Sequence, residues 1–213
     1  MRSHLDRSSG VHLELADYRA DFGTYFWNAG QSGFWKLERQ QSFQEPGVAS
    51  WEAFSRGDWD ESLRLLAEER GHYQDYFQKI ADHGFALHRV RVVEEPITPY
   101  LQWELHLLRL KEECGEDTRV VGPDRVRAFE TEAPLPEIIV IGTAVLYEIL
   151  YDEDGILAGG IRHVEPDTIS ACRQFIRALH ASGERLDGFF RRRVTDLAPP
   201  AVMSAAPGRP TPS

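Results

Sequence analysis

Two arginines and a glutamate lie close together in the segment 86–121, which reads ALHRVRVVEEPITPYLQWELHLLRLKEECGEDTRVV. Alternation along a strand places Arg89 and Arg91 on the same face. In the helical segment that follows, Glu104 and Lys111 fall inside an arc of apolar side chains at 100° per residue. A carboxylate buried without a partner costs several kcal/mol, so Glu104 requires one of the two arginines.

This constellation has two interpretations. The first is a site for an anion or a carboxylate, with a third cation on the next strand, built from Arg89, Arg91, Tyr100, Glu104 and Arg119. The second is a closed network of ion pairs that fixes the register between the strand and the helix. Buried charge pairs serve structure more often than chemistry, which favours the second interpretation.

The sequence contains no complete catalytic, nucleotide or metal motif. Its glycine runs lack the spacing and the lysine of phosphate-binding loops, and no serine sits in a Gly-x-Ser-x-Gly turn. The Asp152–Gly155 cluster has the wrong spacing for a calcium loop and predicts a hairpin turn. His72, His83 and His88 have no partner in sequence, so we expect exposed or capping roles for them. We therefore predict no catalytic residue, no metal site and no cofactor.

Composition indicates a globular protein with an acidic surface. The chain has 213 residues, a formal net charge of -10 and 42% hydrophobic residues. The charge repels nucleic acid at long range, and the short basic run Arg191–Arg193 is more typical of a solvated helix end. No window of 18 consecutive apolar residues predicts a membrane span. Cys114 and Cys172 lie far apart and suggest no disulfide, so we expect a cytoplasmic protein.

Hydrophobic periodicity and turn signals predict alternating helices and strands. Helical spacing covers 12–27, 49–54, 59–80 with a break near Gly71, 99–114 and 166–183. Extended segments are expected at 34–43, 85–93, 117–121, 138–141, 145–151 and 156–163. This order predicts an α/β or α+β domain, with one mixed sheet covered by helices. We place that single domain at 11–196, between a flexible N-terminus at 1–10 and a disordered Pro/Ala/Ser-rich tail at 197–213.

Four short blocks carry a resemblance to a known family. They are FWKLE at 34–38, RVRVVEEPITPYLQWE at 89–104, GEDTR at 115–119 and YDEDG at 151–155. Together they resemble an uncharacterised family of actinobacterial domains of unknown function. Genes of that family lie near helix-turn-helix regulators, which implies a regulatory or accessory setting. Its layout is also similar to phospholipase D-like sheets, but this sequence lacks the His-x-Lys pair of that chemistry.

Three functions remain open on these grounds. The first is a non-catalytic regulatory or accessory protein whose Arg/Glu face binds an anionic small molecule or an acidic segment of a partner, such as a helix-turn-helix regulator. The alternative is an enzyme on a degenerate phospholipase D-like fold, with Glu104 as general acid or base and the arginines holding a phosphate or carboxylate. That alternative needs Glu104 in an open pocket, and a sealed ion pair argues against it. The third is an interaction module that dimerises through its aromatic N-terminal third.

Overall fold

The computed structural model describes residue 5 and residues 9–130 and 133–201. The predicted flexible N-terminus and disordered tail fall mostly outside these residues. The strands are β1 (Val11–Glu14), β2 (Phe34–Glu38), β3 (Leu87–Val92), β4 (Asp117–Val121), β5 (Ile138–Ile141), β6 (Val145–Tyr151), β7 (Leu157–His163) and β8 (Glu184–Arg185). The α-helices are α1 (Leu15–Phe26), α2 (Ala49–Ser55), α3 (Trp59–Glu68), α4 (Arg70–Asp82), α5 (Pro99–Cys114), α6 (Pro166–Ser182) and α7 (Leu186–Arg193).

Within the described residues, eight strands form one mixed sheet in the order β1-β7-β6-β5-β2-β3-β4-β8. The pairs β2–β3 and β3–β4 are parallel, and the remaining pairs are antiparallel. Helices α2, α3 and α4 connect β2 to β3, and α5 connects β3 to β4, because parallel neighbours require a crossover. The predicted mixed sheet covered by helices is therefore confirmed.

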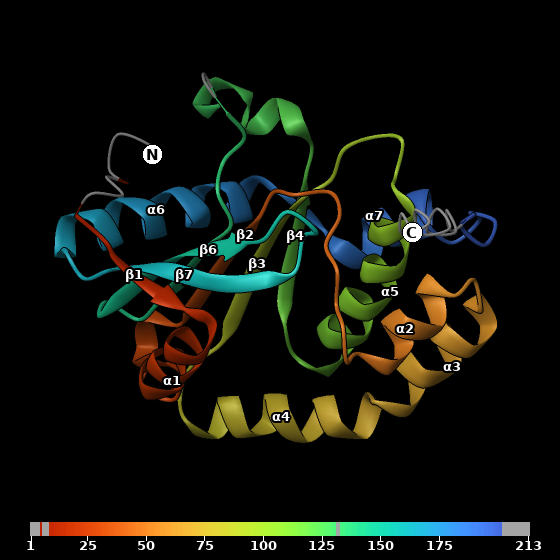
Figure 1. Cartoon of the computed structure of the whole chain (residues 1–213), viewed down its shortest axis with the longest axis horizontal. Coiled ribbons are helices and arrows are strands. Elements are labelled where there is room, and N and C mark those ends of the chain that lie inside the picture. Colours follow the sequence, from red (N-terminus) through yellow and green to blue (C-terminus); the bar gives the residue numbers. More distant parts are fainter. Residues whose placement is uncertain (1–4, 6–8, 131–132, 202–213) are drawn as a thin grey trace, which may run out of the picture.

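Helices cover both faces of the sheet. Figure 1 shows α6 on one side of the sheet and α1 and α4 on the other. The α6 side buries alternate strand residues such as Leu37, Val90 and Val140 against Cys172 and Ile176. The opposite side is covered by α1 and α4 over β2 and β5, and by α5 and α7 over β4. No helix in the described part of the chain is long and apolar enough to cross a bilayer.

Helix α5 begins and ends where the sequence signals predict. The Thr98 side chain accepts a hydrogen bond from the Leu101 backbone N–H at 3.1 Å, and Pro99 occupies the first turn. Gly115 follows the last turn with a φ of 132°, a conformation that glycine adopts without a steric cost. These signals set where α5 begins and ends. The side of α5 that faces the sheet carries Glu104 and Lys111.

Three sequence expectations need correction. The start of the predicted 12–27 helix is strand β1, because backbone pairing with β7 outweighs helical spacing there. A Cβ on Gly159 would lie 2.2 Å from the Leu13 carbonyl oxygen, so the absent side chain permits this close approach. The extended segment expected to reach Phe43 ends as a strand at Glu38. Strand β8 and helix α7 were not predicted, although the basic run at 191–193 does end a helix.

Candidate functional site

Charged side chains run across β2 and β3 on the sheet face covered by α1, α4 and α5. The parallel register pairs Lys36 with Arg89 and Glu38 with Arg91, so all four side chains share that face. We call this set the charge ladder, together with its two carboxylate partners outside the strands, Glu104 on α5 and Glu116 before β4. Its six members divide into a closed end and an open end.

The closed end is an ion pair sealed from solvent. Arg91 is 0% exposed and Glu104 is 4% exposed. Arg91 Nε donates to Glu104 Oε2 at 2.7 Å, and Arg91 Nη1 donates to the Val92 carbonyl oxygen at 3.2 Å. The Tyr100 hydroxyl lies 3.5 Å from Glu104 Oε1 and 3.1 Å from Glu45 Oε1. These contacts hold α5 against β3.

The open end centres on Arg89, which bridges two carboxylates. Arg89 Nη1 lies 2.5 Å from Glu38 Oε2, while Nε and Nη2 donate to Glu116 Oε1 at 3.0 and 2.8 Å. Lys36 forms a further ion pair with Glu38. Lys36, Arg89 and Glu116 all line a cavity of about 330 Å³ that is open to solvent.

Aromatic side chains form the walls of this cavity. They come from α1, α4 and the first residue of β2, and they are Tyr18, Phe22, Phe26, Phe34, Tyr73, Tyr76 and Phe77. Burial raises the pKa of Tyr73 and of Tyr76 to about 12, so both hydroxyls remain protonated hydrogen-bond donors. The cavity thus combines an apolar wall with cations at one end, and we call it the α1/α4 pocket.

Lys111 completes the cationic end of the α1/α4 pocket. It lies on α5, and its ammonium stands 5.3 Å from the Tyr73 ring centroid. In the described part of the chain, no carboxylate lies within ion-pair distance of Lys111. Burial and the neighbouring Arg89 lower the pKa of Lys111, and the charges of Glu116 and Glu38 only partly oppose this shift. An anion in the pocket would compensate this charge.

The ladder sets the ionisation of its own carboxylates. Burial raises the pKa of Glu38, but the charges of Arg89 and Lys36 outweigh burial and hold that pKa well below its usual range. Burial raises the pKa of Glu104, and Arg91 only partly opposes this shift. Glu38 is therefore a fixed anion that neutralises the strand cations.

Glu137 is a buried carboxylate at the end of the ladder. Its Oε1 accepts hydrogen bonds from the Arg39 and Gln40 backbone N–H groups, both at 2.6 Å, where the chain leaves β2. Burial, reinforced by the negative charge of Glu38, raises its pKa to about 7. Glu137 therefore titrates near neutrality inside the fold.

The structure brings together four of the five predicted site residues. Arg89, Arg91, Tyr100 and Glu104 share one side of the sheet, and Arg91 is the partner that Glu104 required. Arg119 is not among them, because alternation on β4 turns it to the α6 side, where its Nη2 lies 3.3 Å from Asp117 Oδ1.

Sequence reasoning missed the role of four further residues. Lys36 and Glu38 alternate on a short strand next to β3. Their relation to Arg89 and Arg91 can be recognised only once the strand order is known. Lys111 was recognised inside the apolar arc of α5 without a role. Glu116 was recognised only as part of the block at 115–119. Lys36 and Glu38 become interpretable once β2 is known to lie beside β3, and Lys111 and Glu116 once both are known to lie near Arg89.

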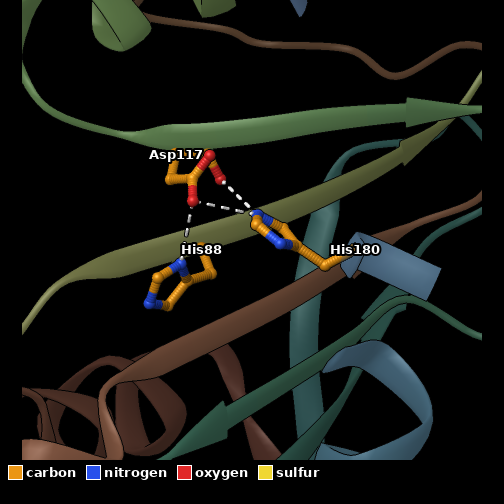
Figure 2. Close-up of side chains that lie close together, drawn as sticks. All are labelled: His88, Asp117 and His180. Atoms are coloured by element: carbon orange, nitrogen blue, oxygen red, sulfur yellow. Dashed lines mark hydrogen bonds and ion pairs between the residues drawn. The ribbon is translucent and has the colours of Figure 1, made fainter. Parts of the chain in front are cut away.

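A second cluster lies on the opposite face of the sheet and contains His88, Asp117 and His180 (Figure 2). His88 Nδ1 lies 3.5 Å from Asp117 Oδ2, and His180 Nε2 lies 3.4 Å from the same oxygen. Each residue offers one metal-ligand atom, and these atoms lie within 4.8 Å of one another. His88 is therefore part of a cluster of potential metal ligands, and the expected exposed or capping role does not describe it fully. Sequence reasoning missed the cluster because its members lie on three separate elements.

The chain belongs to a family described as a domain of unknown function (DUF6879), whose model matches residues 20–191. This match confirms the resemblance to a family of unknown function and includes the whole region from 34 to 161. The search of curated proteins and the search of solved structures each found no match.

Breaking the closed end should be costly. We expect Arg91→Met to lower the free energy of unfolding by about 3–5 kcal/mol, because it leaves Glu104 buried without its partner. The double variant Arg91→Met/Glu104→Gln should recover part of that loss in urea unfolding. The exposed pair Arg64–Glu68 is the matched control and should show little coupling. Equal coupling energies in the double-mutant cycles of the Arg91–Glu104 and Arg64–Glu68 pairs would mean that water reaches the closed end.

Glu137 should make stability depend on pH. Its pKa is about 7 when folded and about 4.5 when unfolded, so the folded state retains a proton between these values and stability falls as pH rises through that window. Glu137→Gln should remove this fall in stability. Between pH 4 and pH 8, the free energy of unfolding of the variant should therefore rise relative to that of wild type by on the order of 1–3 kcal/mol. Urea unfolding across pH measures it, with Glu153→Gln in an exposed turn as the control. A constant difference between the Glu137→Gln variant and wild type would refute this assignment.

Proposed function

We propose that the protein is a non-catalytic regulatory or accessory protein that binds a small anionic ligand with an aromatic body in the α1/α4 pocket. The observation that carries the proposal is the meeting of Lys36, Arg89 and Lys111 at one end of an aromatic-walled cavity. The ligand anion would contact these cations, and its ring would lie among the aromatic walls. A partner such as a helix-turn-helix regulator would then receive the signal.

Charge balance supports an anion at this position. Glu38 and Glu116 neutralise Lys36 and Arg89 through the contacts of the open end. Lys111 adds a further positive charge beside them, and taking a charge out of water without a partner is unfavourable. A carboxylate or phosphate would pair with Lys111 and with the solvent-facing part of Lys36.

The chemistry of the lining, and not volume, distinguishes this pocket. Two other cavities have volumes of about 370 and 360 Å³. The first is lined by one arginine, Arg125, next to Asp124, and the second has no lysine or arginine in its lining. The α1/α4 pocket joins three cations to seven aromatic side chains. Its volume is near the lower end of ligand pockets, which run from about 300 to 1,000 Å³, and suits a single-ring ligand.

The alternative enzyme receives less support. It required Glu104 as a general acid or base in an open pocket. The raised pKa of Glu104 is what an acid would need, but its side chain is sealed against Arg91 and does not line the α1/α4 pocket. A general acid must come within hydrogen-bond reach of its substrate. The geometry therefore favours binding over acid–base chemistry at Glu104.

Phenyl phosphate is a suitable probe, because it joins one aromatic ring to one anion. We expect isothermal titration calorimetry to show saturable 1:1 binding, weakened at least about tenfold by Lys111→Met through loss of a charge-assisted contact. Lys79→Met is the matched control, since Lys79 stacks on Trp27 and does not line the pocket.

Two analogues separate the parts of the site. Inorganic phosphate should bind more weakly than phenyl phosphate because it lacks the ring, and benzyl alcohol should bind more weakly because it lacks the charge. The proposal is contradicted if wild type and Lys111→Met bind phenyl phosphate equally strongly. Absence of binding for phenyl phosphate, benzoate and 4-hydroxybenzoate alike would also contradict it.

A further inference from the structure

We infer that His88, Asp117 and His180 bind one divalent transition-metal ion of the zinc class. This site lies on the α6 face of the sheet, so it is independent of the α1/α4 pocket (Figure 2). The three residues come from β3, β4 and the last turn of α6. The fold thus brings two imidazoles and one carboxylate together from positions far apart in sequence.

The spacing of the donor atoms suits an ion of this size. Zinc binds imidazole nitrogen and carboxylate oxygen at about 2.0–2.2 Å in tetrahedral geometry, which separates neighbouring ligand atoms by about 3.3–3.5 Å. Asp117 Oδ2 lies 3.5 Å from His88 Nδ1 and 3.4 Å from His180 Nε2. All three donor atoms lie within 4.8 Å of one another, so small side-chain rotations would bring them onto one ion.

The surrounding side chains orient two of the three donors. The His88 ring stacks on Trp35 with ring centroids 4.0 Å apart. Arg119 Nη2 lies 3.3 Å from Asp117 Oδ1, which leaves Oδ2 turned toward the imidazoles. Such outer contacts fix ligand orientation in metal sites. They also give Arg119 a role that differs from the one expected from sequence.

His88 Nδ1 is a buried polar atom with one weak contact. It is sealed from solvent, and its contact with Asp117 Oδ2 is long at 3.5 Å and does not count as a hydrogen bond in the described structure. A buried polar atom without a good hydrogen bond is unfavourable, and a metal ion would accept the lone pair of the neutral ring.

The donor set selects the class of ion. Calcium and magnesium prefer all-oxygen ligands, whereas two imidazoles and a carboxylate suit zinc, cobalt or nickel. Three protein ligands leave at least one position for water or another ligand. His180 Nε2 also lies 3.1 Å from the Asp117 carbonyl oxygen, so without metal it donates a hydrogen bond there. Metal binding requires this proton to move to Nδ1.

The test uses the untagged full chain and three metal ions, Zn²⁺, Co²⁺ and Cu²⁺. Titration with Zn²⁺ by calorimetry should give one saturable site, and Co²⁺ should develop the intense visible absorption of tetrahedral coordination. We expect His88→Gln and His180→Gln each to weaken Zn²⁺ binding at least about tenfold and to abolish the Co²⁺ band. Tryptophan fluorescence should fall in part on binding of Cu²⁺ or Co²⁺, because the His88 ring that stacks on Trp35 becomes a ligand.

Controls make each outcome decisive. His12→Gln removes an exposed histidine that lies 3.5 Å from Glu14 without a second imidazole, and it should leave binding unchanged. Asp117→Asn tests the third ligand in case a histidine variant fails to fold by circular dichroism. The inference is overturned if wild type shows no saturable site. It is also overturned if affinity is unchanged in folded His88→Gln and His180→Gln, or if binding disappears only in Cys114→Ser.

Discussion

The structure depends on the burial of two arginines, Arg89 and Arg91, on one face of β3. A guanidinium cannot lose its charge at neutral pH, so each buried arginine requires carboxylate partners. The fold supplies Glu38 from the neighbouring strand, Glu104 from α5 and Glu116 from the turn before β4. These pairings tie β2, β3 and α5 together. The order β2-β3-β4 and the position of α5 are therefore consequences of charge as well as of apolar packing.

The ladder has different surroundings at its two ends, and this difference is the basis of the proposed binding site. Around Arg91, α5 excludes solvent and the guanidinium is paired with Glu104. Around Arg89, the aromatic side chains of α1 and α4 leave a cavity, and Lys111 brings a cation that forms no ion pair within the described residues. The chain as a whole is acidic, with a net charge of -10. The anion that we propose would therefore be held by short-range contacts in a partly desolvated pocket, where screening by salt is weaker than at the surface.

The sequence predicted the elements around β3 and α5 well, because alternation, Thr98, Pro99 and Gly115 are local signals. It also required a partner for Glu104, and Arg91 is that partner. The pocket was not predictable from sequence, since it depends on β2 lying beside β3 and on α1 and α4 crossing the same face. The His88, Asp117 and His180 cluster was hidden for the same reason, because strand register and the end of α6 alone bring those residues together. Arg119 was named as a third cation of the site, but its position on the α6 side follows from the register between β3 and β4, which the sequence does not reveal.

The most direct test uses the three lysines of the chain, Lys36, Lys79 and Lys111. Reductive methylation with ¹³C labels each ammonium while keeping its charge, and nuclear magnetic resonance then reports each lysine separately during a titration with phenyl phosphate. The signals of Lys36 and Lys111 should shift together along one saturation curve, while that of Lys79 stays in place. An anion site at the open end of the charge ladder is contradicted if phenyl phosphate binds but the signals of Lys36 and Lys111 do not move. It is also contradicted if the signal of Lys79 shifts instead.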